Sequence, residues 1–416
     1  MKAISRVCVF LLLMAFVAIA CGDDDDPSTS SGQADDDEDS ADDDATDDDS
    51  SDDDATDDDD DDNPLLHPEA PGPFTVGNRS FFFTDESREL SCGDGPRTLL
   101  VEIWYPAADD ADQGAENTIE DFFLGRLDEV LELIGNQGEM ENLPTGSYRD
   151  AALHPQAQAL PVIVFSHGFM SNRFQNFTMA AYLASHGYVI VAPDHICNAM
   201  VTLTPEAAVA GSPLSIFSTM RERTGDVDFL LALLRDAPPE FLAGKLDMTR
   251  TALWGHSWGG LTVSESIKDH PEVGALLQMA SFGTPVVPET VGAASMYFWG
   301  KQEKVMRMFT DWHYAFMDAM PPPKFSLEFF DTGHFAFSDL CRFVPPIANF
   351  ANGCGTERRV DGQGEFTNPD HDALHAVLDA YATAFFGAAL YGLPELAAYL
   401  NENHWPEMME YAVTPQ

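Results

Sequence analysis

The sequence contains one serine whose neighbours are typical of a catalytic nucleophile. Residues 250–263 read as a short apolar strand, a Gly-x-Ser-x-Gly turn centred on Ser257, and an amphipathic helix. A serine in such a turn takes a strained backbone conformation, and its side chain projects from the strand-to-helix corner. Gly255 and Gly259 lack a Cβ, so the two arms can pass closely. The pattern predicts a nucleophile elbow; the alternative is a structural turn that contains a serine by chance.

A serine hydroxyl needs a base to remove its proton, and His334 is the best candidate for that base. It follows residues 325–330, which we predict to be the last strand, and comes directly after a glycine, so we expect it on a mobile, exposed loop. The other histidines fit less well. His167 and His256 lie in motifs that point them elsewhere, His195 follows a strand end and would line the cleft, and His371 and His375 look like helix-surface residues.

The third member of such a site is an acid that holds the imidazole tautomer and stabilises its positive charge. In a chain with the order serine, acid, histidine, this acid follows the strand before that of the histidine. Glu303 is the only acid in the loop after the predicted strand 294–299. A surface glutamate is the alternative for Glu303, and Asp311 on the following helix is the second candidate for the acid. Asp331 is too close to His334 in sequence.

An ester-cleaving serine also needs two backbone N–H groups that stabilise the oxyanion. One should come from Trp258, directly after the nucleophile. The other should come from Phe169, in the loop Ser166-His-Gly-Phe after an apolar strand. We expect the rings of Phe169 and Trp258 to flank the acyl pocket.

Strands and helices alternate regularly in the region that must position these residues. We predict strands at 161–165, 188–192, 251–254, 274–279, 294–299 and 325–330, and helices at 174–186, 215–234, 261–268 and 372–386. Such alternation implies an α/β fold with a mostly parallel sheet, helices on both faces and the site at the carboxyl ends of the strands. An antiparallel pair, 80–84 and 97–105, should precede it. An insertion at about 107–160 contains a predicted helix, 119–134, which is either a lid or a packed decoration.

The N-terminal part differs in composition from the rest. Residues 1–21 have a basic start, an apolar run and the ending Ala18-Ile-Ala-Cys21, which predicts a signal peptide with lipidation at Cys21; ordinary cleavage after Ala20 is the alternative. Residues 22–64 are an Asp-rich linker in which Asp-Asp-Asp-Ala-Thr-Asp-Asp-Asp occurs at 42–49 and 52–59. We expect it to be a disordered tether, with weak cation binding as the sharper alternative. One domain should occupy 65–416.

Charge and cysteine content restrict the partners and the compartment. Residues 23–62 hold 24 of the 70 acidic residues, which leaves 46 acidic and 19 basic residues in 63–416. This acidity argues against nucleic acid and anionic membranes as partners. Apart from Cys8 and Cys21 the chain has four cysteines. We predict a disulfide between Cys341 and Cys354, which would close the loop after His334 and leave Cys92 and Cys197 as the other pair; four buried free thiols are the alternative. No Cys-x-x-Cys motif or histidine-rich run suggests a metal.

Five short motifs carry a family resemblance. Ser-His-Gly-Phe at 166–169, Ala-Ser-His-Gly-Tyr at 184–188, Ala-Pro-Asp-His at 192–195, Gly-His-Ser-Trp-Gly-Gly at 255–260 and Gly-His-Phe at 333–335 resemble bacterial α/β-hydrolases related to platelet-activating-factor acetylhydrolase, dienelactone hydrolase and cutinase-like polyester hydrolases. The resemblance covers roughly 97–345. It implies an α/β-hydrolase fold and a serine carboxylester hydrolase that acts on small-molecule, lipid or polyester-type esters without a cofactor.

Three departures leave the subfamily open. The acid position holds Glu303 rather than aspartate. The acetylhydrolases proper place the acid after the strand that corresponds to 274–279, where this chain has Gln278 and Met279. Dienelactone hydrolases use cysteine as the nucleophile. We expect an exported enzyme, on the bacterial outer membrane or cell surface through a lipid anchor, or else periplasmic or secreted. The rival hypotheses are a binding or structural lipoprotein with an inactive hydrolase fold, and an amide or peptide hydrolase.

Overall fold

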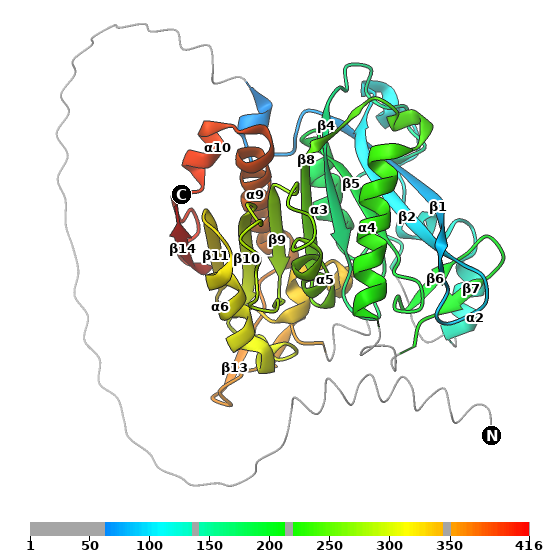
Figure 1. Cartoon of the computed structure of the whole chain (residues 1–416). Coiled ribbons are helices and arrows are strands. Elements are labelled where there is room, and N and C mark those ends of the chain that lie inside the picture. Colours follow the sequence, from blue (N-terminus) through cyan, green and yellow to red (C-terminus); the bar gives the residue numbers. More distant parts are fainter. Residues whose placement is uncertain (1–62, 135–140, 213–218, 344–350, 416) are drawn as a thin grey trace, which may run out of the picture. The chain divides into compact units, whose positions relative to one another are not determined.

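A ten-stranded sheet forms the centre of the folded part of the chain (Figure 1). The computed structural model describes residues 63–134, 141–212, 219–343 and 351–415. The predicted signal segment, the lipidation site Cys21 and the Asp-rich linker up to residue 62 lie outside these residues. From one edge to the other the strands are β14 (Met409–Thr414), β11 (Lys324–Phe329), β10 (Ala294–Gly300), β9 (Ala275–Met279), β8 (Leu246–His256), β4 (Leu160–Ser166), β5 (Val189–Pro193), β2 (Pro96–Ala107), β1 (Thr75–Glu89) and β3 (Tyr148–Arg149).

The six central strands are parallel, and the antiparallel strands lie towards the edges. Strands β5, β4, β8, β9, β10 and β11 run in one direction. At one side β1 and β2 form the predicted antiparallel pair, with Phe81 opposite Val101. At the other side β14 pairs antiparallel with β11, so the prediction that β11 is the last strand was wrong. The chain returns after its long C-terminal helix to cover the edge that β11 would otherwise expose.

Helices cover both faces of the sheet, as predicted. Along β4, Ile163 and Phe165 point into one apolar core and Val162 and Val164 into the other, because alternate residues of a strand face opposite sides. The first core contains α3 (Phe177–Ser185) and α9 (His371–Phe386), and the second contains α4 (Met220–Asp236), α5 (Trp258–Ser266) and α6 (Thr310–Ala319). Figure 1 shows α4, α5 and α6 in front of the sheet. Two sheltered faces explain the continuous apolar runs of the central strands.

The insertion after β2 is not one continuous helix. A 3-10 turn, Ile119–Phe123, is followed by α2 (Leu127–Ile134), and Leu124 and Gly125 between them have positive φ angles of 54° and 72°. The predicted helix 119–134 was therefore wrong at this break. Ile119 and Phe122 are fully buried, and Phe122 stacks on Phe174 at 4.6 Å between ring centroids. The 3-10 turn is thus a packed decoration.

The remaining short elements lie in loops, and disulfides anchor two of those loops. Small two-stranded sheets are formed by β6 (Val201–Leu203) with β7 (Ala208–Ala210) and by β12 (Thr356–Arg358) with β13 (Glu365–Thr367), and two short helices are α7 (Leu340–Phe343) and α10 (Pro394–Tyr399). Cys92 is bonded to Cys197 and Cys341 to Cys354. Two disulfides in one chain suggest an extracellular or periplasmic environment.

Helix α9 and its continuation to Tyr391 are long and apolar enough to cross a membrane. Within the described residues it is the one helix of this kind, and 78% of its apolar window is buried inside the protein. It is therefore the core helix of a folded domain, and its side chains fill the space between β-strands and α3.

Candidate active site

Ser257 lies at the sharp corner between β8 and α5. Its backbone has φ 56° and ψ −125°, a strained combination for a residue with a Cβ. A Cβ on Gly255 would lie 2.4 Å from the carbonyl oxygen of Gly259, and one on Gly259 would lie 1.8 Å from that of Ser166. Both glycines therefore permit close backbone approaches, as the sequence predicted. The corner directs the Ser257 hydroxyl towards the loop that follows β11.

His334 meets this hydroxyl. It begins a 3-10 turn, His334–Phe337, just after β11, and its Nε2 lies 2.8 Å from Ser257 Oγ. Its exposed fraction is 1%, so the expectation of an exposed histidine was wrong. Phe335 packs edge-on against the imidazole, with 4.9 Å between ring centroids, and helps to fix its orientation. An imidazole in this position can take the serine proton.

Glu303 holds the other nitrogen of the imidazole. It follows β10, and its Oε2 lies 2.8 Å from His334 Nδ1. Its Oε1 accepts a hydrogen bond of 2.8 Å from the backbone N–H of Met306, which fixes the carboxylate. The second candidate, Asp311, is exposed at the start of α6, and Asp331 forms an ion pair with Arg359. Of the candidate acids, Glu303 is the one that the fold places against the histidine.

The two residues expected to form the oxyanion hole lie close to Ser257: Trp258 follows it in the chain, and a Cβ on Gly168, the neighbour of Phe169, would lie 3.4 Å from Ser257 Cβ. Neither the backbone N–H of Phe169 nor that of Trp258 has a hydrogen-bond acceptor in the described part of the chain. Trp258 is the first residue of α5, where an N–H has no partner inside the helix. The rings of Phe169 and Trp258 lie 6.5 Å apart in an edge-to-face arrangement. Two unsatisfied N–H groups beside a reactive hydroxyl are the chemical requirement for binding an oxyanion.

Gln175 and His256 connect the loop Ser166–Phe169, here called the oxyanion loop, to the turn His334–Phe337, here called the histidine turn. Gln175 Oε1 accepts a hydrogen bond from the Gly168 N–H at 2.7 Å, and its amide nitrogen lies 2.5 Å from His256 Nδ1. His256 Nε2 in turn lies 3.0 Å from the carbonyl oxygen of His334. Burial, and then the neighbouring His334, lower the pKa of His256 to about 3, so it is neutral and can accept one hydrogen bond and donate the other. The sequence indicated only that His256 points away from the substrate.

Asn352 joins the histidine turn to the loop after β10 that carries Glu303, here called the acid loop. Sequence analysis did not identify Asn352. Its Oδ1 accepts hydrogen bonds from the backbone N–H groups of His334 (3.0 Å) and Lys304 (2.9 Å), and its Nδ2 donates to the carbonyl of Gln302 at 3.1 Å. The Cys341–Cys354 disulfide closes the loop that carries Asn352. Only its position next to a Gly-Cys pair could have drawn attention to Asn352, because its partners are distant in sequence.

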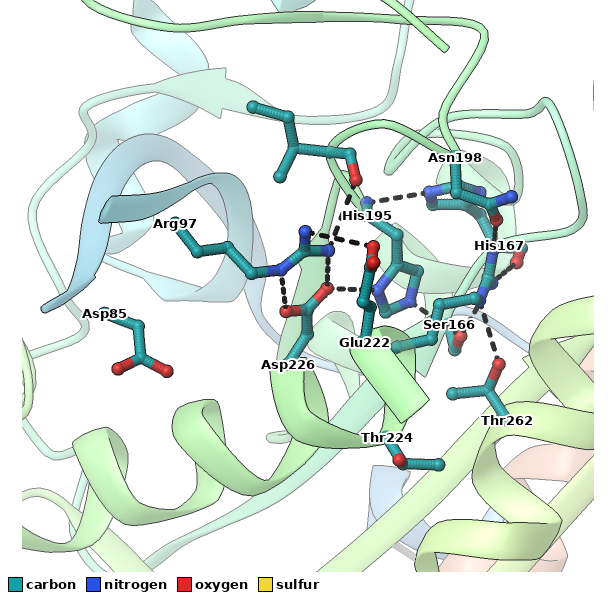
Figure 2. A network of polar contacts seen from close by, with 12 residues as sticks. Asp85, Arg97, Ser166, His167, His195, Asn198, Glu222, Thr224, Asp226 and Thr262 are labelled. Carbon is teal, nitrogen blue, oxygen red and sulfur yellow. Dashed lines mark hydrogen bonds and ion pairs between the residues drawn. The ribbon is translucent and has the colours of Figure 1, made fainter. Parts of the chain in front are cut away.

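A buried polar network contacts the oxyanion loop through the Ser166 side chain (Figure 2). His195 Nε2 lies 2.9 Å from Ser166 Oγ, and His195 Nδ1 lies 2.9 Å from Asp226 Oδ2. All three residues are fully buried, so the expectation that His195 lines the cleft was wrong. Asp226 also receives two hydrogen bonds from Arg97, at 2.6 and 2.7 Å. Burial opposes the charge of Asp226, but Arg97 and His195 hold its pKa below the usual value.

Arg223 completes this network. Its guanidinium donates to Ser166 Oγ at 3.1 Å and to Thr262 Oγ1 at 2.9 Å, and it also bonds to Asn198 Oδ1 and to the carbonyl oxygen of His167. Burial lowers the pKa of Arg223 to about 9, which still leaves it charged at neutral pH. A buried charge therefore holds the Ser166 side chain and the carbonyl group of His167.

Apolar side chains lie beside the candidate oxyanion residues. One buried cluster consists of Leu261, Phe282, Trp299 and Met306, and Trp258 and Phe309 pack against it. Two large apolar side chains next to this cluster in sequence, Met308 and Trp312, are 80% and 46% exposed. The ring of Trp312 lies 6.4 Å from that of Phe282, which links the exposed side chains to the buried cluster.

The comparisons with known proteins relate the chain to acetylhydrolases and esterases. A family model described as platelet-activating factor acetylhydrolase, isoform II, matches residues 62–211, which include the loop Ser166–Phe169 but none of Ser257, Glu303 and His334. Platelet-activating factor acetylhydrolase from Cavia porcellus is 24% identical over 237 residues. That alignment covers 49% of this chain and 52% of the guinea-pig protein, so the chain spans about half the length of this curated relative.

A solved structure matches over more of the chain. The ferulic acid esterase of Streptomyces cinnamoneus superposes with a TM-score of 0.58 at 20% identity, over 83% of this chain and 98% of the esterase. At this identity the match is evidence for the fold. The predicted resemblance to the acetylhydrolase and esterase group is confirmed, and the chain has the α/β-hydrolase fold.

Proposed function

We propose that this protein is a serine carboxylester hydrolase that uses Ser257, His334 and Glu303. The observation that carries the proposal is the continuous line of hydrogen bonds from Glu303 through His334 to Ser257, each of 2.8 Å. The similarity to an acetylhydrolase and to a ferulic acid esterase supports ester substrates.

The reaction has two halves. Ser257 Oγ attacks the ester carbonyl carbon while His334 Nε2 takes the hydroxyl proton, and the backbone N–H groups of Phe169 and Trp258 stabilise the oxyanion. When the tetrahedral intermediate collapses, the C–O bond to the alcohol breaks and His334 returns the proton to that oxygen. Water then attacks the acyl-enzyme, with His334 again as base, and releases the acid and the free Ser257. The Glu303 carboxylate stabilises the imidazolium.

Apolar surroundings favour an ester with an apolar part. The cluster of Leu261, Phe282, Trp299 and Met306 next to Trp258 provides a wall for such a group, and Met308 and Trp312 extend it to the surface. We expect hydrolysis of p-nitrophenyl esters, and an acyl-length series from acetate to octanoate will show how long a chain the wall accepts. Wild-type protein should release p-nitrophenol from at least the short esters and Ser257→Ala should not. Equal release by both proteins would refute the proposal.

We also propose a lipid anchor at Cys21, which rests on the signal-like residues 1–20 and on the long polar segment after the cysteine. Incorporation of labelled palmitate in a bacterial host should occur in the wild-type chain and be lost in Cys21→Ser. Release of an unlabelled wild-type protein into the periplasm or medium would refute the anchor without affecting the proposed hydrolysis.

A further inference from the structure

Three potential metal ligands meet between α3, α9 and the turn that carries His334. His371 and His375 lie one helical turn apart on α9, and their rings stack at 3.8 Å. Asp339 Oδ1 lies 3.0 Å from His371 Nε2 and 4.0 Å from His375 Nδ1. These three atoms all lie within 4.8 Å of one another. Both histidines were predicted to be on the helix surface, but His375 is only 3% exposed and His371 is partly buried, so that prediction was wrong.

The outer ring nitrogens of both histidines have hydrogen-bond acceptors. His375 Nε2 lies 3.3 Å from the carbonyl oxygen of Ala336, and His371 Nδ1 lies 3.1 Å from Asp372 Oδ1. Donation to these acceptors leaves a lone pair on His371 Nε2, which lies 3.0 Å from Asp339 Oδ1, and one on His375 Nδ1, which lies 3.3 Å from the Thr178 hydroxyl and 4.0 Å from Asp339 Oδ1. Metal-binding histidines usually have this arrangement, in which the outer N–H is held by a carbonyl or carboxylate. Without a cation, the contact between His371 Nε2 and Asp339 Oδ1 needs a proton on Nε2, and a bound cation would take the place of that proton.

The carboxylate at the centre of the cluster is deeply buried. Asp339 is 0% exposed, and in the described parts of the chain only histidines form ion pairs with it. Thr178 donates two hydrogen bonds to it, from the hydroxyl at 2.6 Å and from the backbone N–H at 3.0 Å. Buried charges in proteins are normally paired or bound to a metal.

We propose that Asp339, His371 and His375 bind a divalent metal ion of the zinc class. Ligand atoms about 2.1 Å from a tetrahedral zinc lie about 3.4 Å apart, so small side-chain shifts from the present separations close the site. Two imidazoles and one carboxylate favour zinc and similar transition metals over calcium and magnesium, which prefer oxygen ligands. A cavity of about 150 Å³ lined by His371 and by the Cys341–Cys354 disulfide gives an ion access to the ligands.

The position of this site indicates a structural role. Asp339 belongs to the segment after the His334 turn, His371 and His375 belong to α9, and His375 also bonds to Ala336 within that turn. A bound ion would therefore cross-link α9 to the turn that positions His334. It would raise the thermal stability of the protein and take no part in the reaction with the ester. The proposal does not depend on the proposed hydrolase activity.

Metal binding can be tested with the mature full chain, carrying a tag without histidine and freed of metal by a chelator. Titration with Zn²⁺ should show one ion bound per chain in addition to any weak binding by the Asp-rich segment, together with an increase in melting temperature. Co²⁺ should give visible absorption bands of a low-symmetry nitrogen and oxygen site. The 1:1 Zn²⁺ binding and the Co²⁺ bands should both be lost in His375→Gln. In His371→Gln the affinity for both ions should fall at least 10-fold. His371 is partly exposed, so its replacement disturbs folding less than that of the buried His375.

His270→Ala is the matched control, because the His270 side chain is exposed to the same extent as that of His371 (15%) and also lies between two carboxylates, those of Asp228 and Glu272, outside the proposed site. It retains the Asp-rich segment and should bind Zn²⁺ as the wild type does. A wild-type chain with no 1:1 Zn²⁺ binding would overturn the proposal. So would a His371→Gln protein that binds Zn²⁺ and Co²⁺ with unchanged affinity.

Discussion

Three side chains from three separate loops form the proposed catalytic line, and each is held by at least one further contact. The Ser257 backbone is pinned by a hydrogen bond of 2.9 Å from its N–H to the Met279 carbonyl, and the Glu303 carboxylate by the Met306 N–H. His334 is fixed between them. Such preorganisation matters because a displacement of about 1 Å can reduce a rate by about 10²-fold.

Replacing either reacting group should abolish ester hydrolysis while the fold remains. Ser257→Ala removes the nucleophile and His334→Ala removes the base, and we expect kcat to fall by about 10⁴- to 10⁶-fold. Steady-state kinetics and circular dichroism should be measured for both variants, with His270→Ala as a control that keeps full activity. Turnover within 10-fold of the wild type in either variant would show that the replaced residue is not the proposed nucleophile or base.

The identity of the acid has a separate test. Glu303→Gln keeps the shape of the side chain but takes away the charge that stabilises the imidazolium, so kcat should fall by about 10⁴-fold. Asp311→Asn should have little effect, because Asp311 is exposed at the start of α6. If the Asp311 variant were the impaired one and the Glu303 variant active, the assignment of the acid would be wrong.

At the scale of elements, the acid loop and the histidine turn depend on the loop closed by Cys341 and Cys354. Asn352 joins the two through side-chain hydrogen bonds to His334, Lys304 and Gln302. Asn352→Ala should lower kcat by about 10²-fold with little change in KM, because it shifts the base and leaves the acyl pocket intact. Asn401→Ala, on the exposed surface, is the control. A change confined to KM would argue against a positioning role.

Removing the disulfide should act on stability as well. The bond joins residues 13 apart, and closing a loop of that size contributes about 3 kcal/mol in the chain-entropy view. Cys341→Ser together with Cys354→Ser should therefore lower the free energy of unfolding by about this amount and reduce activity. Urea unfolding and peptide mapping of the non-reduced wild type check it. A wild type in which Cys341 is free or bonded elsewhere would contradict the pairing.

The network behind the oxyanion loop can be tested at Asp226. Asp226→Asn leaves the buried Arg97 with only its longer contact of 3.5 Å to the Glu222 carboxylate, and breaking a buried ion pair typically costs about 3–5 kcal/mol. Asp228→Asn, two residues later on α4, affects only a surface pair with His270 and should change stability by less than about 1 kcal/mol. Chemical unfolding of both variants gives the comparison. Equal free energies of unfolding for the two variants would show that the network does not stabilise the protein.

How far the sequence could predict these elements depended on the range of the interactions. Apolar runs and local motifs located β4, β5, β8 to β11 and the elbow at Ser257, because those signals lie within a few neighbouring residues. The break at Leu124 and the return of β14 to the sheet edge have no strong local signal. The partners of Asn352, Gln175 and His195 are set by tertiary packing, so their roles appeared only in the folded chain.

At the scale of the whole molecule, buried histidines make stability depend on pH. Outside the proposed metal site, burial lowers the pKa of five histidines below the usual 6.5: His167, His186, His195, His256 and His313. They stay neutral in the folded state while the unfolded chain binds protons below pH 6.5. Each therefore lowers the free energy of unfolding by about 1.4 kcal/mol per pH unit as the pH falls from 6.5 towards its folded pKa.

Fewer groups act in the opposite direction. Asp194 and Asp379 have pKa values raised by burial, and His270 has its pKa raised mainly by its hydrogen bond to Asp228. Stability should consequently be nearly constant between pH 7 and 8 and fall between pH 6.5 and 4.5. Urea unfolding at half-unit steps of pH measures this, and a stability that rises on acidification would contradict the expected balance.

The central claim is that Ser257 is an activated nucleophile, and an active-site-directed fluorophosphonate probe tests it most directly. Labelling followed by mass spectrometry of the peptides should place the phosphonyl group on Ser257 in the wild type and in His270→Ala. Ser257→Ala should not be labelled, and His334→Ala should react far more slowly because the base is gone. A folded wild-type protein that remains unlabelled, or that is labelled on another serine, would contradict the account and favour a hydrolase fold without turnover.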